Sequence, residues 1–303
     1  MDETLDDDCG TAERFRQVAP DDDEREGRRM HASLLSRLFG DPYRPSRIGR
    51  FVMLEHIGHG GMGRVYAAYD EELDRKVAIK MLLDDELPTQ AERTRFLREA
   101  RALGRLSHPN VVTVHEVGES DGRIFVAMEY VQGESLRDWL GTEPDWSQVL
   151  EVFVQAGQGL VAAHRAELIH RDIKPANIMR RDDGVVKVLD FGIVRMATNR
   201  LTASMDAAPV VGSSSLSTET SSLTRTGAVM GTPAYMAPEQ HQGDVVDERS
   251  DQYGFCIALW EGLTGSRPFV ADDGDSMLEA KRSGPPPWPS EAPAVPRVVV
   301  EAL

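Results

Sequence analysis

The stretch Gly58-His59-Gly60-Gly61-Met62-Gly63-Arg64-Val65 decides between two fold classes. Its spacing, G-x-G-x-x-G, occurs in dinucleotide-binding folds and also in glycine-rich loops that lie over phosphates. A dinucleotide-binding fold requires a helix directly after the glycines. Residues 64–69 and 76–83 are instead short runs rich in Val, Ile and Tyr, which are typical of strands. We therefore expect the glycines to turn a hairpin, with bare backbone N–H groups available to phosphates.

The segments around this hairpin predict a first half dominated by strands. Further strands are expected at 51–57, 111–117 and 124–130. One helix interrupts them, and its start is marked by Thr89 with Glu92 three residues later, the pattern of a capping box.

The second half is predicted to be mostly helical. An amphipathic helix is expected over 147–168, followed by short strands at 178–180 and 185–189. A helix over 250–263 is apolar nearly all round, which predicts a fully buried element. Residues 197–222 lack periodicity and are expected to form a mobile loop. A sheet-rich lobe followed by a helical lobe is an α+β arrangement.

Composition and charge exclude several classes of protein. The chain has 303 residues, of which 41% are hydrophobic and 28% charged, a balance typical of globular proteins. The net charge of −16 argues against a nucleic-acid partner. No apolar run approaches the ~18 residues of a membrane-spanning helix. Two cysteines favour a reducing cytoplasm. Residues 1–46 are rich in Asp and Glu and are expected to form a mostly disordered acidic arm.

Two charged residues in the first half stand out by position. Val77-Ala78-Ile79-Lys80 places a lysine inside an apolar strand, where its ammonium requires an anionic partner. Glu99 lies at the edge of the inward stripe of the expected helix and is a candidate for that partner. Periodicity alone is equally consistent with an ordinary solvated glutamate.

Three further motifs follow in order: His170-Arg171-Asp172-Ile173-Lys174-Pro175-Ala176-Asn177, Asp190-Phe191-Gly192 and Ala237-Pro238-Glu239. Any one of them could arise by chance, but the whole series in order is very improbable. The series resembles that of the bacterial Hanks-type (eukaryotic-like) Ser/Thr protein kinases, over roughly residues 49–303. The resemblance implies a two-lobed protein-kinase-like fold, with an antiparallel-sheet N-lobe over 49–131 and a mostly helical C-lobe over 132–303.

The resemblance also implies which residues meet the nucleotide. Gly58, Gly60 and Gly63 would cover the ATP phosphates, and Val65 belongs to the same binding set. Lys80 would hold the α- and β-phosphates and be oriented by Glu99. The backbone of Glu129 and Val131 would meet adenine. Asn177 and Asp190 would hold Mg²⁺, which oxygen ligands suit.

The same resemblance implies how the transfer is catalysed. Asp172 would accept the proton of the substrate hydroxyl, and Lys174 would neutralise charge on the transferred phosphoryl group. Thr232 would help to position both, and Asp251 would anchor the backbone of the catalytic loop. The expected partners are ATP and the Ser or Thr hydroxyls of proteins, with no nucleic acid and no membrane segment.

Regulation is expected in the segment before Gly231. Arg171 invites an anion beside Asp172, and a phosphate on Thr224 or Thr226 would supply about −1.5 to −2 charge. The hypothesis is activation by autophosphorylation, with self-association as a route for it in trans. The alternative is that both threonines are ordinary loop hydroxyls.

The C-terminus departs from the family pattern. In the family, later helices carry an arginine that pairs with the glutamate matching Glu239, whereas this chain stops at Leu303. A buried carboxylate without its partner can cost ~3–5 kcal/mol, so we expect a weakened large lobe or a fragment of a longer parent. A catalytically dead kinase-fold scaffold is the main alternative function. A kinase of small molecules is a third, although it should lack Ala237-Pro238-Glu239, which shapes a peptide groove.

Overall fold

The computed structural model describes residues 46–60, 63–82, 89–120, 122–191, 233–271 and 273–302. The predictions of an acidic arm, of a loop at 197–222 and of phosphorylation at Thr224 and Thr226 lie outside these residues, apart from position 46.

A six-stranded sheet in the order β1-β2-β3-β4-β6-β5 carries the first half of the described chain. Its strands are β1 (Arg47–Ile48), β2 (Phe51–Gly60), β3 (Gly63–Asp70), β4 (Arg75–Met81), β5 (Val114–Ser120) and β6 (Arg123–Glu129). The expected glycine hairpin is confirmed, because β2 and β3 pair antiparallel with Gly60 opposite Gly63.

The fifth strand begins three residues later than the sequence predicts. Val111 and Val112 do not continue it, because Val111 forms a parallel bridge to Val188 and the Val112 N–H donates to the Val188 carbonyl at 3.0 Å. These apolar residues therefore join the first half of the chain to the second.

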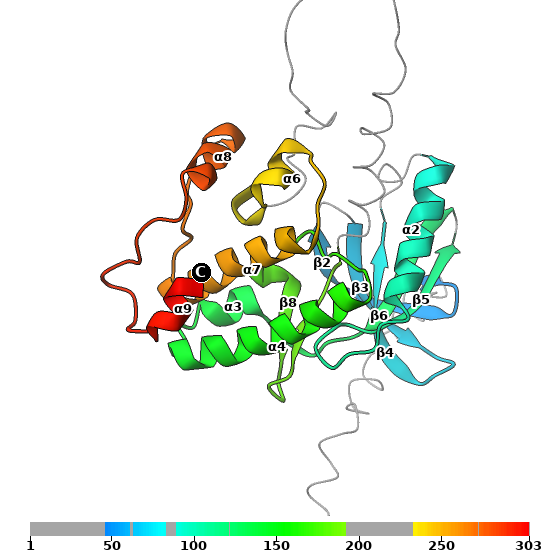
Figure 1. Cartoon of the computed structure of the whole chain (residues 1–303). Coiled ribbons are helices and arrows are strands. Elements are labelled where there is room, and N and C mark those ends of the chain that lie inside the picture. Colours follow the sequence, from blue (N-terminus) through cyan, green and yellow to red (C-terminus); the bar gives the residue numbers. More distant parts are fainter. Residues whose placement is uncertain are drawn as a thin grey trace, which may run out of the picture. The chain divides into compact units, whose positions relative to one another are not determined.

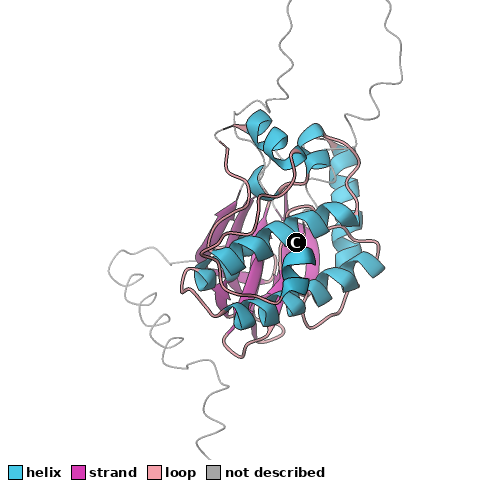
Figure 2. Cartoon of the chain, turned by 60° about the vertical axis from the view of Figure 1, so that its left-hand side comes forward, coloured by secondary structure: helices cyan, strands magenta, loops and turns pink. Residues whose placement is uncertain are grey.

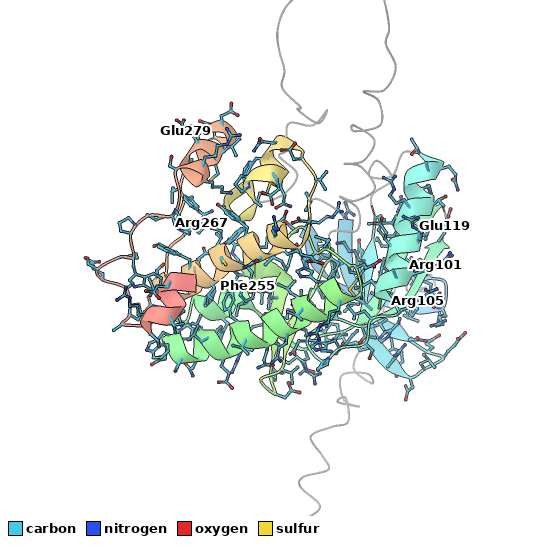
Figure 3. The ribbon with its side chains drawn as sticks, in the orientation of Figure 1. Arg101, Arg105, Glu119, Phe255, Arg267 and Glu279 are labelled. Carbon is cyan, nitrogen blue, oxygen red and sulfur yellow. The ribbon has the colours of Figure 1, made fainter. Side chains whose placement is uncertain are left out.

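Helix α2 (Gln90–Leu103) is the one helix that the structure describes between these strands, and it begins directly after Thr89 as expected. Phe96, Ala100 and Leu103 are buried, and the helix contacts β5. Arg101 on α2 and Arg105 just after it are exposed (Figure 3). The apolar face thus holds α2 on the sheet and leaves the charged face to solvent.

The second half of the described chain is mostly helical and, with the sheet, gives two lobes (Figures 1 and 2). Its helices are α3 (Leu136–Leu140), α4 (Trp146–Arg165), α6 (Pro238–Gln242), α7 (Glu248–Thr264), α8 (Gly274–Arg282) and α9 (Arg297–Ala302). A small sheet of β7 (Gly133–Ser135), β8 (Ile178–Arg181) and β9 (Val186–Val188) and the 3₁₀ turns η1 (Pro175–Asn177) and η2 (Pro233–Tyr235) complete it.

Helix α4 ends three residues before the predicted limit. Its start is fixed by a capping box, in which the Asp145 and Gln148 side chains each accept a backbone hydrogen bond. At its end Glu167 adopts φ 59°, and the Leu168 N–H donates back to the Ala163 carbonyl. Leu168 is buried, so the apolar pattern continues past the helix although the helical backbone does not.

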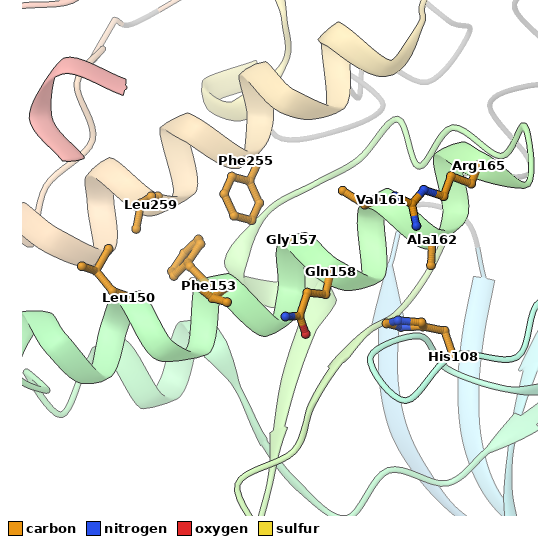
Figure 4. A pocket seen from close by; sticks show the side chains of 11 residues that line it. His108, Leu150, Phe153, Gly157, Gln158, Val161, Ala162, Arg165, Phe255 and Leu259 are labelled. Carbon is orange, nitrogen blue, oxygen red and sulfur yellow. The ribbon is translucent and has the colours of Figure 1, made fainter. Parts of the chain in front are cut away.

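The prediction that the helix over 250–263 is fully buried is wrong. Ile257, Ala258 and Trp260 are buried, but Phe255 and Leu259 are only partly so. These two side chains face a groove of about 790 Å³ that they share with apolar residues of α4 (Figure 4). An apolar sequence shows that a helix can be covered on all sides, but not that the described chain covers it.

Candidate active site

Lys80 and Asp190 form the central contact between the two lobes. Lys80 lies on β4 opposite Val65 of β3, and Asp190 follows β9 by two residues. The Lys80 Nζ donates to Asp190 Oδ1 at 2.6 Å. Burial raises the pKa of Asp190, but the charge and hydrogen bond of Lys80 outweigh it and hold this pKa below its ordinary value. The carboxylate therefore stays ionised at neutral pH.

Asn177 and Asp172 lie next to this pair. The Leu189 N–H donates to the Asn177 carbonyl at 2.8 Å, which holds η1 beside the residue before Asp190. The Asn177 Nδ2 donates to the Asp172 carbonyl at 2.7 Å and to its Oδ2 at 3.0 Å. The Lys174 Nζ donates to the same Oδ2 at 2.8 Å. One carboxylate oxygen of Asp172 is thus fixed by two donors.

Asp251 at the start of α7 anchors the backbone around Asp172. It is 1% exposed and accepts the His170 N–H at 2.7 Å and the Arg171 N–H at 2.6 Å. His164 of α4 lies 2.7 Å from the same carboxylate. The expected anchoring of the loop by Asp251 is confirmed.

His170 connects the two acidic segments from inside the core. Burial lowers its pKa, so the ring is neutral. Its Nε2 lies 2.6 Å from the Leu189 carbonyl, and its Nδ1 accepts the Asp172 N–H at 3.2 Å. The ring also packs on Phe191 at 4.7 Å. His170 therefore ties the position of Asp172 to that of the segment that carries Asp190.

Arg171 and Asp190 both have left-handed backbones, with φ of 67° and 55°. Such conformations cost about 1–3 kcal/mol in residues other than glycine and are maintained by their surroundings. At Arg171 the surroundings are visible: Asp251 accepts its N–H, and the Gln240 Nε2 donates to its carbonyl at 2.9 Å. The two strained residues are thus next to Asp172 in the sequence, for Arg171, and bonded to Lys80, for Asp190.

The structure requires glycine at one position of the hairpin but not at another. Gly63 has φ 137°, and a Cβ there would lie 2.1 Å from the Met81 carbonyl oxygen on β4. A Cβ on Gly58 would meet nothing within 4 Å. Gly63 is thus required by the sheet itself, whereas Gly58 leaves open space. Gly60 ends β2, with Gly61 and Met62 outside the described residues.

Glu99 lies in the middle of α2 and is partly buried. The acidic partner that the structure gives Lys80 is Asp190, so an orienting contact from Glu99 stays a prediction.

Glu129 and Val131 lie where β6 ends and the second half of the chain begins. The Glu129 N–H donates to the Thr113 carbonyl at 2.8 Å. Its carboxylate lies 2.8 Å from Lys187 on β9. This contact between the lobes has no signal in the sequence, because a lysine in a three-residue strand is ordinarily exposed.

Thr232 lies outside the described residues, so its role is untested. The expectation of a buried Glu239 without a partner is wrong. Glu239 is only partly buried, and the Ser250 hydroxyl donates to its carboxylate. The cost assumed for a fully buried, unpaired charge therefore does not apply.

The oxygen atoms at this site suit Mg²⁺. The Asn177 Nδ2 donates to Asp172, which leaves the Asn177 Oδ1 for a cation. The Lys80 Nζ donates to Oδ1 of Asp190, which leaves the Asp190 Oδ2 for the same cation. Within the described ranges, no group of three or more His, Cys, Asp or Glu side chains could hold a metal ion. A site with two protein ligands is what Mg²⁺ commonly uses when phosphates and water supply the rest.

In the part of the chain that the structure describes, no helix is long and apolar enough to cross a bilayer.

Comparisons with known proteins agree with this geometry. Residues 51–287 match the model of the protein kinase domain. The chain is 38% identical over 263 residues to the serine/threonine-protein kinase pkn3 of Myxococcus xanthus, covering 82% of this chain and 45% of that protein. It is 37% identical to PknA of Mycobacterium tuberculosis, with 84% of this chain and 56% of PknA covered. The chain thus spans about half the length of these curated relatives.

Solved structures show the same likeness. The crystal structure of the Mycobacterium tuberculosis PknI kinase domain superposes with a TM-score of 0.56 and 26% identity, covering 75% of this chain and 79% of that one. The order of motifs, the Lys80–Asp190 pair and the match over residues 51–287 lead to one conclusion. The chain belongs to the protein kinase family.

Proposed function

We propose that this chain is a serine/threonine protein kinase that transfers the γ-phosphate of ATP to protein hydroxyls. The observation that carries the proposal is that two hydrogen-bonded groups, Lys80–Asp190 and Lys174–Asp172–Asn177, are held together where the Leu189 N–H donates to the Asn177 carbonyl. The relatives that match most of this chain are named serine/threonine-protein kinases. None of the residues whose loss would indicate a dead scaffold is missing.

Asp172 is the proposed base. Its Oδ2 accepts from Lys174 and Asn177, which orients the carboxylate that would receive the proton of a substrate hydroxyl. Holding this carboxylate in one orientation lowers the entropic cost of bringing hydroxyl and phosphate together.

The cations of the site act on the phosphate. The ammonium of Lys80 would hold the non-transferred phosphates, and that of Lys174 would stabilise charge on the group in transfer. When bound, Mg²⁺ supplies further charge neutralisation, and Asn177 and Asp190 would hold it. Gly58, Gly60 and Gly63 with Val65 would cover the nucleotide, and the Glu129 carbonyl and Val131 backbone would meet adenine.

The sequence around the base supports hydroxyl specificity and regulation. Lys174 and Pro175 favour Ser or Thr over Tyr as the acceptor. Thr224 and Thr226 are the proposed sites of activating autophosphorylation, with Arg171 as the cation that receives the phosphate and self-association as the route in trans. The proposed compartment is a reducing cytoplasm, on the support of two cysteines.

The proposal is tested by incubating the chain with [γ-³²P]ATP, Mg²⁺ and a generic protein substrate, followed by phosphoamino-acid analysis. Labelled phosphoserine and phosphothreonine are expected. Labelled phosphotyrosine, or transfer to a small molecule but not to protein, would reject it. Mapping of phosphosites in the same sample tests Thr224 and Thr226, and two unmodified threonines in active enzyme would end the regulatory part.

A further inference from the structure

Helix α8 carries a lysine on its inward face, where apolar side chains are expected. Lys281 is 5% exposed and follows the buried Met277 by one helical turn, so both point inward. The aromatic ring of Tyr253 on α7 lies next to this lysine, with 5.8 Å between the ring centroid and the Lys281 Nζ. Among the described residues, no carboxylate forms an ion pair with Lys281. Something other than an opposite charge must compensate for burying this ammonium.

Three acceptors surround the ammonium. The Nζ lies 2.6 Å from the Pro233 carbonyl, 2.6 Å from the Met236 carbonyl and 3.1 Å from the His241 Nε2. An ammonium has three N–H donors, so all three are used. Burial and the neighbouring Lys281 lower the pKa of His241, so its imidazole is neutral. Its Nε2 lies 3.1 Å both from the Lys281 Nζ and from the Pro233 carbonyl, and it accepts from Lys281 in the tautomer that carries its proton on Nδ1.

All three acceptors belong to one stretch, residues 233–241, and this stretch lies beside the catalytic loop. The Gln240 Nε2 donates to the Arg171 carbonyl at 2.9 Å. A Cβ placed on Gly254 would meet the Ile173 carbonyl at 3.1 Å and the Tyr235 carbonyl at 3.3 Å, so these two backbones pass the same point of α7. Residues 233–241 therefore lie directly beside the backbone that carries Asp172.

The nucleotide side of the site is held by other elements. Lys80 comes from β4, Asn177 from η1 and Asp190 from the end of β9, and their bonds do not involve α8. Lys281 can thus change the shape of the 233–241 stretch without changing the groups that would hold ATP.

We propose that Lys281 is a positioning residue that fixes residues 233–241 as one wall of the protein-substrate site. It acts through the backbone of this stretch and sets affinity for the protein substrate rather than for ATP. The inference rests on the proposed kinase function and assigns substrate positioning to a helix outside the catalytic motifs.

The test compares Lys281→Met with Arg282→Met in the full chain. Methionine keeps the length and the apolar stem of lysine but removes all three donors. Arg282 is the adjacent, exposed cation of the same helix, so its variant makes the same change in charge without touching residues 233–241. KM and kcat are measured for a generic protein substrate and KM for ATP, with melting temperature as a check on folding.

Lys281→Met is expected to raise the KM for protein about tenfold and to leave the KM for ATP within about twofold. Arg282→Met should match the wild type in both. An unchanged protein KM in folded Lys281→Met, or an equal rise in both KM values, would overturn the inference. If wild type and Arg282→Met transfer no phosphate, the proposed function has failed instead.

A second variant keeps the test decisive if Lys281→Met does not fold. His241→Leu removes one of the three acceptors at a partly exposed position. It should raise the protein KM about threefold with the ATP KM unchanged, and a protein KM equal to that of the wild type would count against the inference.

Discussion

The ammonium nitrogen of Lys80 lies 2.6 Å from a carboxylate oxygen of Asp190, although 110 residues separate the two in sequence. The lysine comes from the sheet lobe and the aspartate from the helical lobe. Their contact therefore fixes where the lobes meet, and it places a cation beside the proposed metal ligand. Removing Lys80 should affect phosphate transfer more than folding, because the Asp190 carboxylate left behind is 39% exposed. Removing Asp190 should also destabilise the chain, because the Lys80 side chain is only 11% exposed.

Lys80→Met should lower kcat/KM for transfer by about 10²–10³-fold, because it removes a positioned donor from the phosphates. The matched control is Lys76→Met on the same strand, where the side chain is 38% exposed and lies 3.8 Å from Glu55. The control should stay within about twofold of the wild type. Comparable losses in both variants would show that strand β4, rather than the Lys80 ammonium, had been damaged.

Two glycines of the hairpin should respond differently to the same substitution. Gly63→Ala places a Cβ against the Met81 carbonyl at a positive φ, so the chain must shift, and we expect a loss of about 2–4 kcal/mol in unfolding free energy. Gly58→Ala meets open space and should change that free energy by less than about 1 kcal/mol. Urea unfolding followed by circular dichroism distinguishes them, and equal losses would contradict the described hairpin.

Asp251→Asn should destabilise the chain by about 3 kcal/mol and reduce kcat, because the carboxylate accepts two backbone N–H groups that an amide NH₂ cannot fully satisfy. Asp247→Asn is the control on the same helix. Asp247 caps α7, and asparagine caps helices equally well. Chemical denaturation measures both, and a stable Asp251→Asn with full activity would show that the loop does not depend on this anchor.

The stability contributed by Lys281 should depend on pH. Burial lowers the pKa of Lys281 from 10.5 to about 8. Between these values the unfolded chain binds the proton and the folded chain does not, so stability rises with pH. The difference in unfolding free energy between wild type and Lys281→Met should therefore increase by up to about 1.4 kcal/mol per pH unit above about pH 8. A difference that stays constant up to about pH 9.5 would show that this lysine titrates normally.

Much of the fold could be predicted from local patterns. The β2–β3 hairpin follows from glycines between two runs of strand-forming residues, and α2 follows from Thr89 and the spacing of Phe96, Ala100 and Leu103. The end of α4 could not be predicted, because the apolar period continues to Leu168 while the backbone turns at Glu167. The exposed side of α7 was missed for a related reason: composition does not specify what covers a helix.

The candidate site, like the fold, could be predicted from the sequence only in part. The motifs indicated Asp172, Asn177 and Asp190, and the structure brings them together. The helical wheel made Glu99 a candidate for the acidic partner of Lys80, and that contact stays a prediction, whereas the structure shows Asp190, from a distant segment, bonded to Lys80. Lys281 was not singled out, because two of its three partners are backbone carbonyls, which carry no side-chain signature. Its inward place in α8, one turn after Met277, is the signal that could have revealed it.

The most direct test of the account is the rate of ³²P transfer from [γ-³²P]ATP to protein by the wild type and by Asp172→Asn, with nucleotide binding measured in both. The account predicts transfer by the wild type, a fall of about 10²–10⁴-fold in the variant, and equal binding of ATP. Equal rates in the two proteins, or no transfer by a wild type that binds ATP, would contradict it.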